Sequence, residues 1–244
     1  MKKKRLDEVL IERGLASDKK EASFLVMDKR VLSGDTVLHK AGELVPADLP
    51  LRLRGEKKQY VSRAGKKLET ALHHFNVDVS GLVALDVGAS TGGFTDCLLQ
   101  HGVAKVFALD VGYGQLDMKL QHDERVVVFD RTNLKTFSPE ALGEKVDLVV
   151  MDVSFISARS LLPYLPAFLK PSAHVIILVK PQFELPAEKV GDGGIVKDVN
   201  AQQEAVQLVS EAGATLGWTT VGQVPSEIQG AKGNQEHLIF FCAS

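Results

Sequence analysis

The apolar positions divide the chain into two parts, and the pattern changes near residue 60. In the first part, apolar residues recur at helical spacing, at Leu6, Val9 and Leu10 and again at Ala22, Leu25 and Val26. Asp18 and Glu21 form a D-x-x-E pattern typical of a helix start, just before the second run. Short β-like runs follow at 36–38 and 51–54, between glycines and prolines. We therefore predict a small α+β unit.

From residue 60 on, apolar runs of strand length alternate with helical patterns. The strand candidates are 82–86, 103–110, 126–129, 146–152 and 173–179, and the helical stretches between them are 92–101, 115–121 and 158–169. These strands are continuously apolar, as in a parallel sheet covered on both faces. After a helix near 199–212, strands at 219–224 and 237–242 follow with no helix between them. We predict an α/β fold whose mostly parallel seven-stranded sheet ends in an antiparallel hairpin.

A polar connector near 55–61 separates the two parts, so we place the domains at 1–59 and 60–244. The chain is 45% hydrophobic and 25% charged, which excludes wholesale disorder. Its formal net charge of −2 is an average over unlike parts. Through Lys67 there are 17 Lys and Arg against 10 Asp and Glu, or +7, whereas the remainder has 12 against 21, or −9. The basic first part indicates contact with nucleic acid or a membrane surface.

The two cysteines are too few for a disulfide framework or a four-cysteine zinc site. Cys97 and His101 lie four apart on an expected helix, but no further Cys/His pair completes a site, so we predict no metal. The basic start of the chain runs into Leu6-Asp7-Glu8 without the apolar segment of a secretory signal. No apolar stretch approaches the ~18 residues of a membrane span. We therefore predict a cytoplasmic protein without stable membrane insertion.

The segment Asp86-Val87-Gly88-Ala89-Ser90-Thr91-Gly92-Gly93-Phe94-Thr95 follows an expected strand and opens a helix, as phosphate- and nucleoside-binding loops do. Ser90 replaces the second glycine of G-x-G-x-x-G, which argues against NAD because that glycine admits the pyrophosphate. A carboxylate at Asp86 suits a cationic cofactor better than a pyrophosphate. We favour S-adenosylmethionine, with NAD and a simple glycine-rich turn as the alternatives.

Later strand ends supply further candidate contacts for this cofactor. Asp110 is placed to accept hydrogen bonds from ribose hydroxyls, and the polar run that begins at Asp130 suits an adenine edge. The predicted cofactor-binding residues are Asp86, Gly88, Ala89, Ser90, Gly92, Gly93, Phe94, Asp110, Asp130, Arg131 and Thr132.

Two strand ends carry ionisable residues at the edge where open α/β sheets bind ligands, Asp152 and Lys180. Partial desolvation at a strand end lowers the pKa of a lysine, which makes Lys180 a candidate general base supported by Asp152. Lys67 and Glu236 could join them, although ordinary surface charge is the alternative for either one. Such a cluster beside a methyl donor suits methylation of a ribose 2′-hydroxyl, a poor nucleophile that needs orientation and loss of its proton.

Several longer motifs resemble the TlyA (hemolysin A) family across almost the whole chain. They are Tyr60-Val61-Ser62-Arg63-Ala64-Gly65-Lys66-Lys67-Leu68, Asp110-Val111-Gly112-Tyr113-Gly114-Gln115-Leu116, Arg131-Thr132-Asn133, Asp152-Val153-Ser154-Phe155-Ile156-Ser157, Val179-Lys180-Pro181-Gln182-Phe183-Glu184, Gly193-Gly194-Ile195-Val196 and Gly233-Asn234-Gln235-Glu236. The resemblance implies an N-terminal S4 RNA-binding domain and a Rossmann-like, FtsJ-like methyltransferase domain. It further implies 2′-O-methylation of cytidine in ribosomal RNA with S-adenosylmethionine.

By the same resemblance, Lys67, Asp152, Lys180 and Glu236 fall on the family's K-D-K-E tetrad, and Gly88, Asp110 and Asp130 on cofactor positions. Ribosomal RNA or ribosomal subunits are the implied partner. The RNA-binding candidates are Lys3, Lys4, Arg5, Lys19, Lys20, Arg30 and Arg63. The chain departs from the family at Ser17-Asp18-Lys19-Lys20, where S4 domains usually have Ser-Arg, so its RNA footprint is expected to differ. Glu227 stands where the family usually has proline.

Three other functions remain open. A small-molecule methyltransferase would not need the basic first part, and a non-catalytic RNA-binding protein would not need all four tetrad positions. A pore-forming hemolysin, which the family name suggests, would need membrane-active segments that the pattern lacks. The sequence gives neither the target nucleotide nor the oligomeric state.

Overall fold

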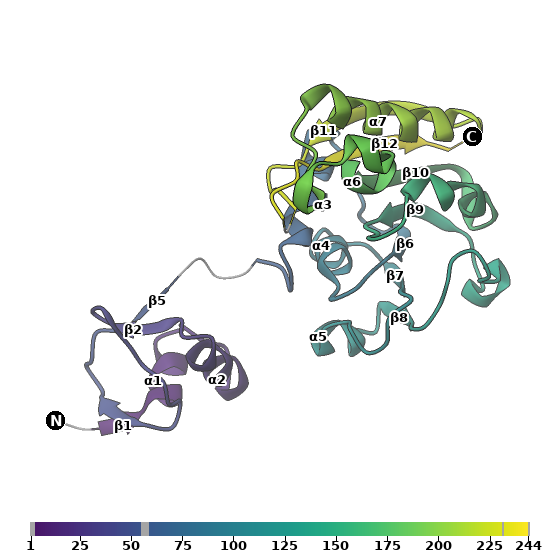
Figure 1. The fold of residues 1–244 in the computed structure, drawn as a ribbon. Coiled ribbons are helices and arrows are strands. Elements are labelled where there is room, and N and C mark those ends of the chain that lie inside the picture. Colours follow the sequence, from purple (N-terminus) through teal and green to yellow (C-terminus); the bar gives the residue numbers. More distant parts are fainter. Residues whose placement is uncertain (1–2, 55–58, 231, 244) are drawn as a thin grey trace. The chain divides into compact units, whose positions relative to one another are not determined.

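A computed structural model describes residues 3–54, 59–230 and 232–243 (Figure 1). The chain forms two compact units, Met1–Lys58 and Gln59–Ser244. Residues 55–58 of the expected connector lie outside the described residues. Among the helices of the described ranges, none is long and apolar enough to cross a membrane.

The first unit packs two helices against short strands. Helices α1 (Leu6–Glu12) and α2 (Lys19–Met27) bury the apolar residues that the helical spacing singled out. Strand pairs complete the unit: β1 (Lys3–Arg5) pairs with β4 (Leu44–Pro46), and β2 (Val31–Ser33) lies between β3 (Thr36–Val37) and β5 (Arg52–Leu53). The sequence predicted β3 and β5 but missed the other three strands.

The start of α2 is a reciprocal cap, as the D-x-x-E pattern predicted. The Asp18 side chain accepts a hydrogen bond from the Glu21 amide at 2.8 Å. The Glu21 carboxylate in turn accepts hydrogen bonds from the Ser17 amide and hydroxyl, each at 2.6 Å. The bond from the Glu21 amide satisfies a donor that the first turn of a helix otherwise leaves free, and the two bonds from Ser17 fasten the preceding residue to the helix.

The second unit is a seven-stranded sheet in the order β11-β12-β10-β9-β6-β7-β8. Five strands run parallel: β6 (Val83–Val87), β7 (Lys105–Leu109), β8 (Val126–Phe129), β9 (Val146–Met151) and β10 (Leu169–Val179). The C-terminal strand β12 (His237–Cys242) runs antiparallel between β10 and the edge strand β11 (Thr219–Pro225). The expected α/β fold with its antiparallel hairpin is confirmed.

Helices cover both faces of this sheet, which explains why its strands are continuously apolar. Helices α3 (Ala64–His74), α4 (Gly93–Gln100) and α5 (Met118–Gln121) pack on the face that contains Ala84 and Leu148. Helix α7 (Val199–Ala214) packs on the opposite face, over Leu85 and Val149. The short helix α6 (Pro181–Glu184) follows β10 directly.

The predicted helix at 158–169 is wrong. The segment forms two 3₁₀ pieces, Ala158–Ser160 and Leu162–Ala167, because Pro163 and Pro166 lack the amide hydrogens that an α-helix requires. Strand β10 also begins at Leu169, earlier than expected, and its register shifts between Leu169 and His174.

Candidate active site

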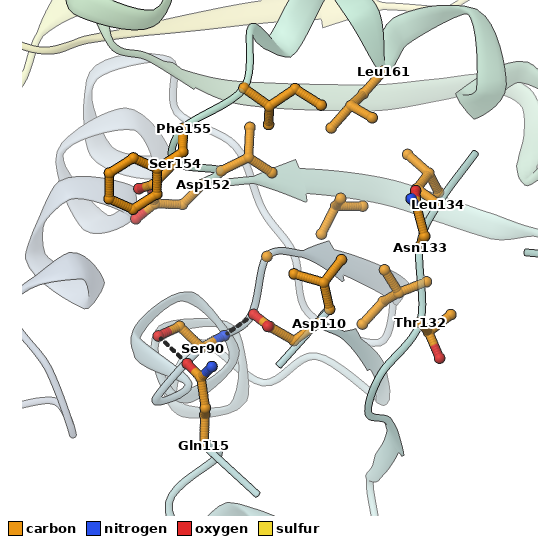
Figure 2. Close-up of a pocket in the computed structure, with 16 residues that line it drawn as sticks. Ser90, Asp110, Gln115, Thr132, Asn133, Leu134, Asp152, Ser154, Phe155 and Leu161 are labelled. Carbon is orange, nitrogen blue, oxygen red and sulfur yellow. Dashed lines mark hydrogen bonds between the residues drawn. The ribbon is translucent and has the colours of Figure 1, made fainter. Parts of the chain in front are cut away.

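A cavity of about 520 Å³ opens beyond the carboxyl ends of strands β6, β7 and β9 (Figure 2). This is the edge where open α/β sheets bind ligands, and the volume suits a small cofactor. Apolar side chains including Leu134, Ile156 and Leu161 form part of its wall, and Asp110 and Asn133 contribute polar groups.

Asp110 is held at the rim by backbone amides. The Ser90 amide donates to Asp110 Oδ2 at 2.8 Å, and the Gly112 amide donates to Oδ1 at 2.7 Å. The Ser90 hydroxyl contacts Gln115 Oε1 at 3.2 Å, so this loop is joined to the segment after β7 (Figure 2). A carboxylate fixed in this way can still accept hydrogen bonds from a diol through its remaining lone pairs.

The segment 86–95, here called the cofactor loop, meets the end of β9 at Gly88, and this position requires glycine. Its φ of +83° lies in the left-handed region, and a Cβ there would lie 2.6 Å from the carbonyl oxygen of Asp152. Any side chain would push the loop away from Asp152. The close approach therefore places the loop beside the second part of the site.

The expected cofactor residues do not all reach the cavities. Gly88, Ser90, Asp110 and Thr132 line the 520 Å³ cavity, and Ala89, Gly93 and Phe94 line an adjoining one of about 140 Å³. Four others line neither. Gly92 packs against Leu116 and Leu120, Asp130 accepts from the Gly114 amide, Arg131 lies over the Tyr113 ring, and Asp86 is fully buried.

Asp86 is part of the support beneath the loop. Its Oδ2 accepts a hydrogen bond from the Thr95 hydroxyl at 2.6 Å. Burial raises the pKa of Asp86 to about 7, and the neighbouring Asp152 and Asp110 carboxylates act in the same direction. The hydroxyl bond ties the end of β6 to the first turn of α4.

The four charged residues of the expected tetrad come together as two ion pairs. Lys180 follows β10, and its Nζ lies 2.6 Å from Asp152 Oδ1, an ion pair that lacks hydrogen-bond alignment. Lys180 Nζ also donates to the Ser154 hydroxyl at 2.8 Å. Lys67 of α3 pairs with Glu236, directly before β12, and both are at least 95% buried.

Ser154 lines all three cavities of this region. The third cavity, of about 320 Å³, is lined by Lys67, Lys180 and Glu236 among others. Lys180 also lines the 140 Å³ cavity, and Asp152 lines both that cavity and the 520 Å³ one. The Lys180–Asp152 pair therefore stands between a cofactor-sized cavity and a second one whose lining includes the charged Lys67 and Glu236.

Comparison with known proteins identifies the family. The FtsJ-like methyltransferase family matches residues 60–242, which include every strand of the large sheet and all four charged residues. The chain belongs to the FtsJ-like methyltransferase family. This assignment confirms a methyltransferase with S-adenosylmethionine as its cofactor and favours it over NAD and over the pore-forming interpretation.

Close relatives match nearly the whole chain. It is 41% identical to the 16S/23S rRNA (cytidine-2′-O)-methyltransferase TlyA of Mycobacterium tuberculosis, over 97% of this chain and 88% of the relative. It is 38% identical to hemolysin A of Brachyspira hyodysenteriae, over 97% and 99%. A solved structure from Streptococcus thermophilus that carries a hemolysin name superposes with a TM-score of 0.76 and 37% identity, over 100% and 90%. The resemblance to the TlyA family is thereby confirmed.

In this FtsJ-like enzyme, the residues present fit S-adenosylmethionine. Asp110 offers a fixed carboxylate for ribose hydroxyls, and the apolar wall suits a purine ring. Gly88 lets the loop approach Asp152, and Gly93 lets it pack against Ser62 and Ala64, which line the smaller cavity together with both glycines. The approach of this loop to Asp152 places the Lys180–Asp152 pair beside the residues that would hold such a cofactor.

Sequence reasoning missed two residues beside the pair. Ser154 binds Lys180, and Phe155 is 93% exposed although it lines both larger cavities. Phe155 has a φ of +65° and its ring lies 5.5 Å from that of Phe183. A bulky residue in the left-handed region is strained, and such strain is typical of functional sites. The signal is visible only in the structure, because it depends on the backbone dihedral angles.

Sequence reasoning also gave no role to Asn234. Its buried side chain accepts a hydrogen bond from the Val196 amide at 2.8 Å and donates to the Gly194 carbonyl at 2.7 Å. These bonds hold the loop that carries Gly194 beside the segment that leads into Glu236.

Several predicted RNA-binding residues of the first unit are engaged within it. Lys4 pairs with Glu12, Arg5 with Asp7, and Lys19 with Glu8, at 2.6, 2.6 and 3.8 Å. The Arg30 guanidinium donates to a backbone carbonyl, whereas Lys3 and Lys20 are exposed. In the second unit, Arg63 lines the 320 Å³ cavity.

Proposed function

We propose that this protein methylates the ribose 2′-hydroxyl of a cytidine in ribosomal RNA. The observation that carries the proposal is the pair of charged contacts, Lys180–Asp152 and Lys67–Glu236, at the junction of a cofactor cavity with a polar cavity. The name of the TlyA relative, an rRNA (cytidine-2′-O)-methyltransferase, supports the same substrate.

The chemistry requires orientation and removal of one proton. S-adenosylmethionine, when bound, supplies an electrophilic methyl group on a sulfonium. In the proposed mechanism Lys180 orients the 2′-hydroxyl and the Lys180–Asp152 pair accepts its proton. The transferred methyl group would leave the sulfonium by breakage of its C–S bond, with the neutral thioether of the cofactor as the leaving group. Ser154 fixes the direction of Lys180. Lys67 and Glu236 form the wall that positions the ribose. Both side chains are buried and they pair with each other.

The proposal divides the work between the units. Residues 1–59 act as an S4-like RNA-binding domain and residues 60–244 as the methyltransferase domain. The cofactor contacts are Gly88, Ala89, Ser90, Gly93, Phe94, Asp110 and Thr132, with Asp86, Gly92, Asp130 and Arg131 shaping the loops around them. Exposed Lys3, Lys20 and Arg63 contact phosphates, together with Lys4, Arg5, Lys19 and Arg30 after exchange of their internal partners. Because the substrate is ribosomal RNA, the proposal places the enzyme in the cytoplasm.

The test compares Lys180, which directly follows β10, with Lys170, which lies near the start of that strand. Lys180 and Asp152 form an ion pair at the carboxyl ends of β10 and β9, and Lys170 forms a matching pair with Asp147 near their other ends, at 2.9 Å. We expect Lys180→Ala to lower methyl incorporation into ribosomal RNA by about 10²–10⁴-fold, the typical contribution of a positioned acid–base group. Lys170→Ala should leave it near the wild-type rate, and both variants should bind S-adenosylmethionine.

Mapping of 2′-O-methyl sites in RNA treated with each variant identifies the product. Full activity of Lys180→Ala would remove its assigned role. Methyl transfer to bases rather than to ribose would refute the proposed reaction while leaving the enzyme a methyltransferase.

A further inference from the structure

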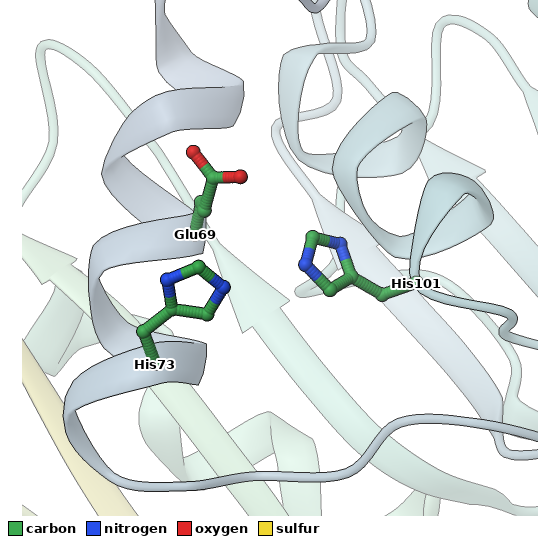
Figure 3. Close-up of side chains that lie close together, drawn as sticks. All are labelled: Glu69, His73 and His101. Carbon is green, nitrogen blue, oxygen red and sulfur yellow. The ribbon is translucent and has the colours of Figure 1, made fainter.

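Helices α3 and α4 bring together a carboxylate and two imidazoles outside the active site. Glu69 and His73 stand one turn apart on α3, and His101 follows the last residue of α4. One ligand atom from each residue lies within 4.8 Å of the other two (Figure 3). None of the three lines a cavity described above. Within the described residues, this is the one such group of metal-ligating side chains.

The His101 ring is oriented as metal-ligating imidazoles are. Its Nδ1 lies 2.8 Å from the carbonyl oxygen of Cys97, so a hydrogen on Nδ1 leaves the Nε2 lone pair for an ion. Figure 3 shows one ring nitrogen of His101 facing His73 and Glu69, and the other turned toward α4. Cys97 is not among the side chains whose ligand atoms lie within 4.8 Å of one another.

Glu69 is also fixed in place. Its Oε1 accepts hydrogen bonds from the Tyr60 hydroxyl at 2.8 Å and from the Gln59 side-chain amide at 2.7 Å. These two donors bond the same oxygen, Oε1, so the Oε2 atom of Glu69 can bind a cation. Two of the three groups are thus oriented before any ion binds, and the exposed His73 can adjust.

We propose that Glu69, His73 and His101 bind a divalent transition-metal ion, with Zn²⁺ as the preferred occupant. Two imidazoles and one carboxylate are a zinc donor set, and a water completes the tetrahedron. Metal–ligand bonds of about 2.0–2.2 Å require donors about 3.5 Å apart, so the group contracts by about 1 Å, mainly through His73. The ion fastens α3, which carries Lys67, to the end of α4, whose start forms the cofactor loop. Its role is structural, since the catalytic cavities lie elsewhere.

The experiment titrates Zn²⁺ alone into the full-length, tag-free, EDTA-treated protein by calorimetry, with Co²⁺ and visible absorption as a second probe of coordination. We expect one ion per chain, and an affinity at least about 10-fold lower in His73→Gln and in His101→Gln. His122→Gln is the matched control: His122 Nδ1 also lies near the carbonyl four residues before it, at 2.6 Å, but this ring belongs to no ligand group in the described ranges.

A second measurement separates binding from folding. Zn²⁺ at about 100-fold excess over its Kd should raise the Tm of the wild type and of His122→Gln by about 5 °C, and that of His73→Gln much less. His73 is exposed, so its replacement is expected to fold normally. Equal affinity in wild type and His73→Gln, or absence of stoichiometric binding in the wild type, overturns the proposal.

Discussion

Asp86 combines burial with a position beneath the cofactor loop. One oxygen receives the Thr95 hydroxyl bond, while Oδ1 is buried without a hydrogen bond from the described residues. An acid in this position stays protonated to higher pH than usual, because the charged form is poorly solvated. The stability of the protein therefore depends on pH through this residue.

Replacement by Asn tests that dependence. The folded-state pKa of about 7 is raised above the usual 3.8, so the stabilisation is full below about pH 4 and is lost as pH rises through 7. The Asn side chain of Asp86→Asn is uncharged at every pH, so the variant does not lose stability in this way as pH rises. We compare the free energy of unfolding of the variant with that of the wild type at each pH. From pH 5 to pH 8, this difference should shift by about 2–3 kcal/mol in favour of the variant. Denaturant unfolding at both pH values measures it, and an equal difference at the two values contradicts the assignment.

The strands of the large sheet were predictable because burial on both faces leaves a strong local pattern. The range 237–242 agrees with β12 at both ends. Asp152 and Lys180 were inferred from strands that end in charge, whereas the full tetrad with Lys67 and Glu236 came from the family resemblance. The strand β2 was missed because its three residues are ordered by pairing with β3 and β5 rather than by local preference. Ser154 and Phe155 were missed because a loop conformation leaves no periodic signal.

The loop after Phe155 depends on a single acid of α6. Glu184 is buried and accepts hydrogen bonds from the Ser157 hydroxyl, the Ala158 amide and the Arg159 guanidinium, at 2.5, 2.6 and 3.0 Å. The first of the two 3₁₀ pieces is thus anchored by a charged acceptor. This explains how a segment with two prolines keeps a fixed path beside the site.

We expect Glu184→Gln to lower the free energy of unfolding by about 1–3 kcal/mol, because an amide replaces a charged acceptor of several bonds. Glu204→Gln, at a half-exposed position of α7 that is paired with Lys189, should change it by less than about 1 kcal/mol. Thermal or urea unfolding of the two variants gives the comparison. Similar losses in both would show that Glu184 is not the anchor.

The charge asymmetry divides the chain between a basic start and an acidic remainder, and the internal ion pairs of the first unit reduce its free positive charge. Lys4, Arg5 and Lys19 each have an acidic partner there. In the proposed RNA complex, the phosphates would compete with these partners, whereas Lys3 and Lys20 are exposed. The net basic count of the sequence therefore overstates the number of phosphate contacts.

The salt dependence of RNA binding measures that number. For the double variant Lys3→Ala and Lys20→Ala we expect the slope of log Kobs against log salt to fall by roughly 1.5, about 0.7–0.9 for each lost contact. Lys145→Ala, exposed in the second unit, serves as the control and should leave the slope unchanged. Filter binding or fluorescence anisotropy across salt concentrations provides the data. A slope that the double variant does not alter would exclude these two lysines from the interface.

The position of β12 has a consequence for how the enzyme is made. This six-residue strand lies between β10 and β11. Glu236 directly precedes it and pairs with Lys67 in the site. Its partner Lys67 is synthesised 169 residues earlier. Until β12 has been synthesised, the sheet lacks its β10–β12 and β11–β12 pairings, and Lys67 lacks the carboxylate with which it pairs. This part of the candidate site is therefore completed only when a segment far along the chain from Lys67 has been synthesised.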